Sequence, residues 1–226
     1  MTPQEGGSIV GGTLTDESGG TLTQDRIRSA GRKLLHPIVR SLSRMGVGPT
    51  SVTLAGLAIT GASAYLIWRG DYVMAAVLLV LGSVLDAVDG GIARHIDNET
   101  RSGAVLDSVV DRAGELLVLG AVLVSEIGSS YDLMLYLIPL AIGGSFLVSY
   151  VRARAEGVGI SCSVGVFTRT ERLVLIIAGL LLAGLAGMVW MVYITAAIAA
   201  GTLFTAGQRL VRVYAEDRAS RTCDQG

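Results

Sequence analysis

Long apolar segments separated by short charged stretches constrain the fold of this chain more than any other feature of its sequence. Hydrophobic residues make up 51% of the 226 residues, and charged residues make up only 16%. About 20 consecutive apolar residues can cross the hydrocarbon core of a bilayer as a helix, which satisfies its own backbone hydrogen bonds there. The pattern therefore predicts an all-α integral membrane protein with several spans rather than a soluble domain.

Six apolar segments are predicted to form transmembrane helices. They cover residues 50–68, 72–96, 101–125, 133–156, 169–184 and 188–212. Basic residues gather before the first segment and in alternate connections, whereas the remaining connections are poor in them. By the positive-inside rule, both termini and the charged ends of the helices lie in the cytoplasm. The predicted location is the inner membrane of the cell, as a multi-pass protein.

The segments outside the six-helix transmembrane domain, residues 46–213, have a different composition. Residues 1–23 are rich in Gly, Thr and Ser, which predicts a disordered tail. Residues 24–45 repeat apolar side chains at helical spacing among several arginines. This is typical of an amphipathic helix that lies on an anionic membrane surface. Residues 214–226 are polar, and we interpret them as a cytoplasmic C-terminal tail.

Four aspartates lie near the charged ends of the second and third predicted helices. Asp86 and Asp89 are three residues apart and share one helical face, and Asp107 and Asp111 are four apart and share another. The polar turn between the helices lets them pack as an antiparallel pair, so that the carboxylates meet. Because these like charges repel one another near hydrocarbon, we expect a divalent cation between them. Oxygen ligands without nearby His or Cys favour Mg²⁺, Mn²⁺ or Ca²⁺ over zinc.

Small residues and one arginine adjoin the aspartates. Gly90 follows the second aspartate, and Gly103 lies one helical turn before the third. A missing side chain at these positions allows a ligand to approach the backbone closely. Arg94, beside the small Ala93, offers a guanidinium group to a phosphate oxygen. Carboxylates, a divalent cation, glycines and an arginine are the groups that a phosphoryl-transfer site needs.

This region resembles the signature of the CDP-alcohol phosphatidyltransferase family. The patterns D-x-x-D-G-x-x-A-R and G-x-x-x-D-x-x-x-D are both present, with eight residues between them. The matching positions are Asp86, Asp89, Gly90, Ala93, Arg94, Gly103, Asp107 and Asp111. The resemblance implies that a membrane enzyme transfers a phosphatidyl group from CDP-diacylglycerol to an alcohol and releases CMP.

The same resemblance implies roles for individual residues. The four aspartates would hold one or two Mg²⁺ or Mn²⁺ ions per subunit, and Asp111 would also act as general base on the acceptor hydroxyl. Gly90, Ala93, Arg94 and Gly103 would lie at the nucleotide end of the donor. Thr53, in the family's P-x-x-x-T pattern, either contacts the nucleotide or only belongs to the start of the first helix. A homodimer is usual for the family.

Arginines on the predicted fourth, fifth and sixth helices form a second charged group at the same membrane face. We expect Arg152, Arg169, Arg172 and Arg209 to bind the phosphate of the acceptor, although single arginines there also serve as orientation signals. The patterns S-Y-x-[KR]-A-R-A-E, R-x-E-R and Q-R resemble the branch of the family that makes phosphatidylinositol phosphate from inositol phosphate.

Two alternatives to this function remain at this stage. The same transferase chemistry could use glycerol 3-phosphate, which also carries a phosphate group. The chain could instead be a cation transporter whose intramembrane aspartates form the ion path. Acids at one rim of the membrane and the absence of repeated halves disfavour the transporter. The formal net charge of −1 gives no indication of a nucleic-acid partner.

Overall fold

A computed structural model describes residues 48–95, 100–162 and 164–223, and within these ranges the chain is entirely helical, with no strand. The predicted tail over 1–23 and amphipathic helix over 24–45 lie outside the described residues. The helices are α2 (Pro49–Trp68), α3 (Tyr72–His95), α4 (Arg101–Ser125), α5 (Met134–Gly157), α6 (Arg169–Ala186) and α7 (Val189–Cys223). The predicted all-α class is confirmed.

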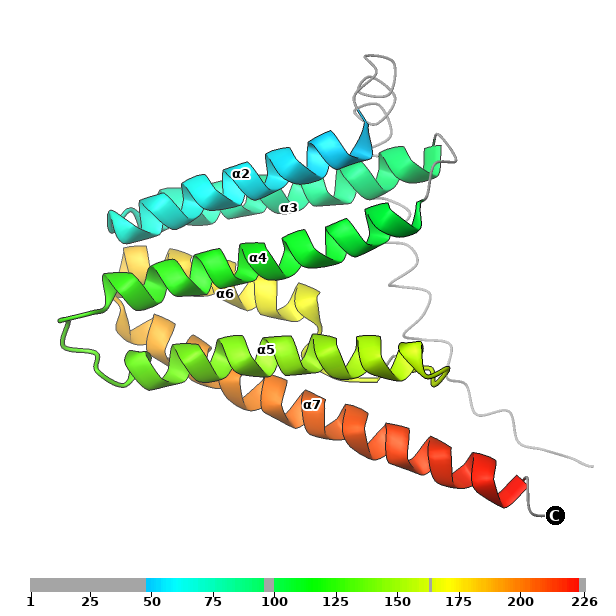
Figure 1. Cartoon of the computed structure of the whole chain (residues 1–226). Coiled ribbons are helices and arrows are strands. Elements are labelled where there is room, and N and C mark those ends of the chain that lie inside the picture. Colours follow the sequence, from blue (N-terminus) through cyan, green and yellow to red (C-terminus); the bar gives the residue numbers. More distant parts are fainter. Residues whose placement is uncertain (1–47, 96–99, 163, 224–226) are drawn as a thin grey trace, which may run out of the picture.

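The helices lie side by side as a single bundle (Figure 1). Helix α2 packs against α3 and α4, α3 packs against α6, and α7 packs against α5 and α6. The centre of the bundle is apolar and includes the fully buried side chains of Ile67, Leu119, Ile138, Leu180 and Ile198. Many other large apolar side chains are exposed on the outside, as expected for helices that face lipid.

Within the described residues, three helices are long and apolar enough to cross a membrane, over Thr50–Trp68, Met134–Gly157 and Val189–Arg218. The apolar part of α3, Tyr72–Asp86, is shorter. Helix α6 begins with three charged side chains, those of Arg169, Glu171 and Arg172, and α4 carries several charged side chains in its N-terminal half. The coarser prediction of a membrane protein is therefore supported by three helices of the bundle.

Local sequence explains where individual helices begin. Pro49 occupies the first turn of α2, where its missing N–H costs no hydrogen bond. The Thr100 hydroxyl accepts a 3.0 Å hydrogen bond from the Gly103 N–H and so caps α4. A Cβ atom at Gly103 would lie 2.9 Å from that hydroxyl oxygen, so a larger residue there would require the Thr100 side chain to shift.

Helix α7 extends well beyond the predicted end of the sixth span at residue 212, and reaches Cys223. The prediction relied on an apolar pattern, which stops near this point, whereas helix formation does not require one. In the extension, the side chains of Arg212 and Glu216 form an exposed ion pair at the favourable i, i+4 spacing, with a separation of 3.3 Å. Polar pairs therefore continue a helix that hydrophobicity alone does not predict.

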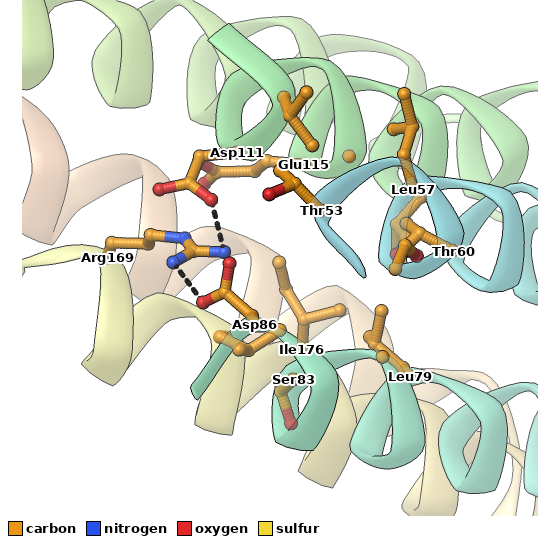
Figure 2. Close-up of a pocket in the computed structure, with 16 residues that line it drawn as sticks. Thr53, Leu57, Thr60, Leu79, Ser83, Asp86, Asp111, Glu115, Arg169 and Ile176 are labelled. Atoms are coloured by element: carbon orange, nitrogen blue, oxygen red, sulfur yellow. Dashed lines mark hydrogen bonds and ion pairs between the residues drawn. The ribbon is translucent and has the colours of Figure 1, made fainter. Parts of the chain in front are cut away.

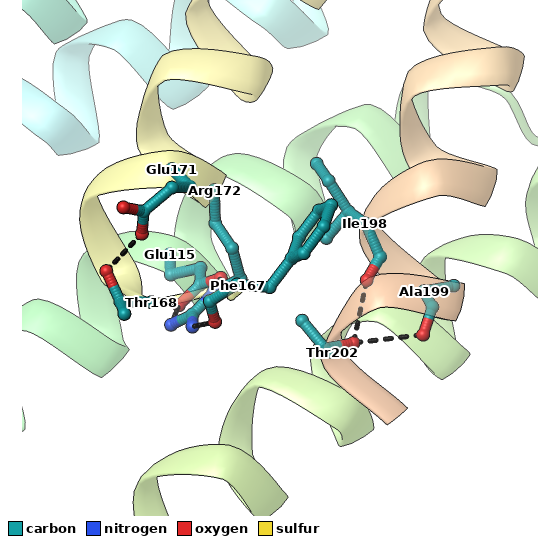
Figure 3. A network of polar contacts seen from close by, with 8 residues as sticks. All are labelled: Glu115, Phe167, Thr168, Glu171, Arg172, Ile198, Ala199 and Thr202. Atoms are coloured by element: carbon teal, nitrogen blue, oxygen red, sulfur yellow. Dashed lines mark hydrogen bonds and ion pairs between the residues drawn. The ribbon is translucent and has the colours of Figure 1, made fainter. Parts of the chain in front are cut away.

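Helices α5 and α7 approach closely where Gly144 faces Thr202. The Thr202 hydroxyl donates to the backbone oxygens of Ile198 and Ala199 on its own helix (Figure 3), and its oxygen and Cβ are the Thr202 atoms that lie nearest to Gly144 of α5. A Cβ atom at Gly144 would lie only 2.9 Å from Thr202 Cβ, whereas one at the exposed Gly143 would meet nothing within 4 Å. Glycine is therefore needed at the first position and not at the second.

We predict that Gly144→Val destabilises the protein by about 1–3 kcal/mol, because overpacking forces α5 and α7 apart. Thermal unfolding in detergent, followed by tryptophan fluorescence, measures the effect. Gly143→Val is the matched control and is expected to leave the melting temperature nearly unchanged. Equal loss of stability in both variants would contradict the close contact between α5 and α7.

Candidate active site

Three of the four predicted aspartates converge at one end of the bundle. Asp86 lies on α3, and Asp107 and Asp111 lie on α4. One carboxylate oxygen from each lies within 4.8 Å of the others. Asp89 follows on α3 together with Gly90, Ala93 and Arg94, and the side chains of these four residues lie outside the described part of the structure.

Among the described residues, the two helices that carry the aspartates pack little along each other, contrary to the prediction. Each packs along α2 instead, and their ends converge beyond it (Figure 1). Small residues allow this arrangement, because a Cβ atom at Gly82 would lie 3.3 Å from Thr60 Oγ1 and 3.6 Å from the Gly56 oxygen. A Cβ atom at Gly114 of α4 would lie 3.4 Å from Thr60 Cγ2. Helix α2 is therefore the surface on which α3 and α4 are aligned.

Arg169, at the first turn of α6, inserts its guanidinium group between two of the aspartates (Figure 2). Its Nη1 donates to Asp86 Oδ2 at 2.8 Å, and its Nη2 lies 2.6 Å from Asp111 Oδ1. The second contact is an ion pair without hydrogen-bond alignment, so the buried Oδ1 has no aligned donor among the described residues. Arg169 was predicted to bind the acceptor phosphate, but in this structure it pairs with the aspartates and lowers their mutual repulsion.

The carboxylate cluster fits a hard divalent cation. Oxygens bound to one ion at distances of about 2.1–2.6 Å lie at most about 4–5 Å apart. The three aspartate oxygens lie within 4.8 Å of one another, which matches this limit. The members are carboxylates alone, without His or Cys, which is the ligand set that Mg²⁺ and Mn²⁺ prefer over zinc. The buried Asp111 Oδ1 adds an acceptor that the described protein groups leave without an aligned donor.

An apolar cavity extends from the aspartates into the bundle between α2, α3, α4 and α6 (Figure 2). Asp86 and Asp111 lie at its polar end, and Leu57, Leu79 and Ile176 line its apolar part. Thr53, the weaker of the predicted donor contacts, is buried in the wall of this cavity. Gly103 does not line it and instead serves the N-cap of α4.

A second cavity, of about 340 Å³, adjoins the aspartates on the other side. All four arginines predicted for the acceptor phosphate line it, together with Asp111: they are Arg152, Arg169, Arg172 and Arg209. Arg154, two residues along α5, does not line this cavity. The predicted arginine group therefore surrounds one space, and we refer to it as the arginine cavity.

The arginines of this cavity are held in different ways. The Arg172 side chain is 3% exposed and binds both carboxylate oxygens of Glu115, at 2.7 and 2.8 Å, as well as the Phe167 oxygen (Figure 3). Arg209 is equally buried, and it donates to the backbone oxygens of Val148 and Val164. In contrast, Arg152 is exposed and pairs only with Glu156 among the contacts found, one turn further along α5.

Glu115 is a site residue that sequence reasoning missed. It lines both cavities and fixes Arg172 through a bidentate salt bridge. Its position four residues after Asp111 places it on the same face of α4, which is the signal that could have identified it. The pattern used for the prediction ended at Asp111.

Known proteins provide an independent comparison. The model of the CDP-alcohol phosphatidyltransferase family matches residues 47–205. The archaetidylinositol phosphate synthase of Methanothermobacter thermautotrophicus is 32% identical over 190 residues, which cover 84% of this chain and 93% of the relative. The phosphatidylinositol phosphate synthase of Corynebacterium glutamicum is 32% identical over 189 residues, which cover 81% and 85%.

Solved structures of the phosphatidylinositol phosphate synthase of Mycobacterium tuberculosis are among those with the same fold. The structure with CDP-DAG bound gives a TM-score of 0.75 at 28% identity, and the match covers 80% of this chain and 94% of that one. The structure in complex with manganese and citrate gives a TM-score of 0.75 at 29% identity, covering 80% and 88%.

We predict that Glu115→Ala destabilises the protein by about 3–5 kcal/mol, because it leaves the buried Arg172 charge without its partner. Thermal unfolding of the purified protein in detergent measures this loss. The control is Glu156→Ala, which breaks the exposed pair with Arg152 and should cost no more than about 1 kcal/mol. If both variants melt alike, the buried salt bridge does not stabilise this end of the bundle.

Proposed function

Since this chain belongs to the CDP-alcohol phosphatidyltransferase family, we propose that it transfers the phosphatidyl group of CDP-diacylglycerol to inositol phosphate and releases CMP. The observation that carries this proposal is the arginine cavity, which is lined by Arg112 and the four predicted arginines and opens directly onto Asp111. Such a cavity suits an acceptor that carries its own phosphate group. The names of the relatives, archaetidylinositol phosphate synthase and phosphatidylinositol phosphate synthase, agree with this acceptor.

The donor is assigned to the aspartate cluster and the apolar cavity beside it. Asp86, Asp107 and Asp111, with Asp89 from the same helix as Asp86, would hold one or two Mg²⁺ or Mn²⁺ ions. When bound, these ions would offset the charge of the diphosphate and stabilise the departing CMP. The crystallised relative contains manganese in one complex and CDP-DAG in another, which supports this assignment.

The nucleotide end of the donor is assigned to neighbouring residues of α2, α3 and α4. Thr53 lies in the wall of the cavity next to Asp86 and Asp111, which supports a contact with the donor. Gly90, Ala93 and Arg94 follow Asp86 on α3 and are assigned by the family pattern. Gly103 does not line the cavity, so its assignment to the donor rests on the family pattern alone.

Asp111 is assigned as the general base. It takes the proton of the acceptor hydroxyl while the acceptor oxygen forms a bond to the lipid-side phosphorus of the donor, and the bond from that phosphorus to the bridging oxygen breaks. The carboxylate lies at the boundary between the two cavities, so it can face both substrates. Arg152, Arg172 and Arg209 would hold the acceptor phosphate and thereby fix the position of the attacking hydroxyl.

We further propose six spans, a preceding amphipathic helix over 24–45, and an active site at the cytoplasmic face. The aspartates and arginines gather at one end of the bundle, whereas the exposed aromatic pairs Tyr65–Trp68 and Trp190–Tyr193 lie towards the opposite ends of their helices. Trp and Tyr are enriched where helices leave the hydrocarbon at either membrane surface, so these pairs support a helix end at the interface. The cytoplasmic orientation is proposed from the positive-inside rule, because the basic residues gather at the end that carries the site. A homodimer is proposed from the family resemblance.

The proposed reaction is tested with purified protein, labelled CDP-diacylglycerol and Mn²⁺ or Mg²⁺. We expect CMP release and labelled phosphatidylinositol phosphate with inositol phosphate, and loss of both when a chelator removes the metal. Glycerol 3-phosphate and free inositol are the comparison acceptors. Preference for glycerol 3-phosphate would change the assigned acceptor. If none of the tested alcohols leads to CMP release, the proposed transferase activity is overturned.

We predict that Arg152→Gln raises the KM for inositol phosphate roughly tenfold, because one charge-assisted hydrogen bond to the phosphate is lost. The KM for CDP-diacylglycerol should change little, since Arg152 does not line the apolar cavity. Arg154→Gln is the matched control, because it removes the same charge from the same helix outside the arginine cavity. Steady-state kinetics of all three proteins check the prediction. An equal rise in both variants would indicate general electrostatic attraction instead of a phosphate contact.

A further inference from the structure

Arg169 differs from the other arginines because it lines both cavities and pairs with the aspartate cluster. Its two terminal nitrogens each reach a different aspartate, Asp86 on α3 and Asp111 on α4 (Figure 2). The guanidinium group therefore lies among the oxygens that the proposed function assigns to a divalent cation. The Arg169 side chain and the divalent cation would therefore compete for the same carboxylates.

The two cations cannot occupy this place together. A divalent ion contacts its oxygen ligands at about 2.0–2.6 Å, so an ion bound through Asp86 Oδ2 and Asp111 Oδ1, the oxygens that Arg169 contacts, leaves no room for the guanidinium group between them. The two positive charges would also repel one another at that distance. Binding of the ion therefore requires Arg169 to leave the position that it holds in this structure.

The surroundings of Arg169 give it a second position. Its side chain is 42% exposed, and it begins α6 beside the arginine cavity, where its long side chain can turn towards solvent and the other guanidinium groups. Arg172 and Arg209 lack this freedom, since each is only 3% exposed and bound on several sides. The Arg169 side chain can therefore change its position, whereas the buried side chains of Arg172 and Arg209 cannot.

We propose that Arg169 is an internal counter-ion of the aspartate cluster that exchanges with the divalent cation and then turns into the arginine cavity to bind the acceptor phosphate. The inference rests on the proposed function, because it takes the aspartates as the cation site. It makes two linked statements. Arg169 opposes cation binding, and the bound cation raises the affinity of the arginine cavity for phosphate, since a displaced guanidinium group becomes available there.

The first statement is tested by the affinity of the full-length, metal-free protein for Mn²⁺, measured by electron paramagnetic resonance and calorimetry. We expect Arg169→Gln to bind Mn²⁺ on the order of tenfold more tightly than the natural protein, within the usual range of coupling between sites. Arg169→Lys keeps the charge without the two-pronged contact and should fall between them. Arg152→Gln removes a charge from the same cavity without touching an aspartate, and should leave the Mn²⁺ affinity nearly unchanged.

The second statement is tested by the affinity for inorganic phosphate with and without saturating Mn²⁺. The natural protein should bind phosphate several-fold more tightly when Mn²⁺ is present. Arg169→Gln should lose most of this gain, whereas Arg152→Gln should keep it, although its phosphate affinity is weaker throughout. Any direct contact between Mn²⁺ and phosphate is common to all variants and is removed by this comparison.

The possible results distinguish a failure of the Arg169 exchange from a failure of the proposed cation site. If the natural protein binds Mn²⁺ and Arg169→Gln, eluting as the same folded species, binds it no more tightly, Arg169 does not compete and the inference is overturned while the cation site stands. If the phosphate gain survives in Arg169→Gln, the transfer of the side chain into the arginine cavity is overturned. If neither protein binds Mn²⁺, the cation site itself is wrong, and the inference fails with it.

Discussion

Repulsion between the carboxylates of Asp86, Asp107 and Asp111 is the constraint on which the rest of this structure depends. At an effective dielectric constant near 20, two carboxylate charges 4.8 Å apart repel by about 3–4 kcal/mol. The three aspartates form three such pairs. A cation must therefore be within reach whenever all three are ionised. Helix α6 meets this demand by beginning next to the cluster, where Arg169 supplies a positive charge.

The packing of the bundle holds these charges together against their repulsion. Helix α2 receives α3 and α4 on glycine-containing surfaces at Gly56, Gly82 and Gly114, so the ends of the two acidic helices have little freedom to separate. On the other side of α4, the bidentate pair between Glu115 and Arg172 ties this helix to α6. Small residues on one face of α4 and a buried ion pair on another thus fix the cluster.

Much of this arrangement follows from patterns that are local in sequence. Apolar periodicity predicts the order and approximate bounds of the helices, and i, i+3 or i, i+4 spacing predicts that Asp107 and Asp111 share a face. What depends on tertiary packing was not predictable: α3 and α4 align on α2 instead of on each other, and Arg169 pairs with aspartates from two other helices.

At two further positions, the structure differs from what the family pattern predicts, and the cause is local. Gly103 fits the pattern of a ligand-binding glycine, yet its N–H also completes the Thr100 cap of α4. Glu115 lies outside the pattern, although the helical period places it beside Asp111. A motif records which residues recur and not which contact each one makes, so a role in helix structure and a role in binding cannot be separated until the neighbours are known.

The position of the site at one end of the bundle follows from the different solvents of the two substrates. The apolar cavity, lined by residues such as Leu57 and Ile176, opens among the helices, whereas the arginine cavity is lined mainly by charged and polar groups. Asp111, Glu115 and Arg169 line both. A lipid diphosphate and a water-soluble phosphate can meet there without either leaving its own medium, because the shared wall carries the carboxylate that is assigned to accept the proton. Its negative charge is also what makes a cation necessary, so the chemistry and the electrostatic cost of this site have the same origin.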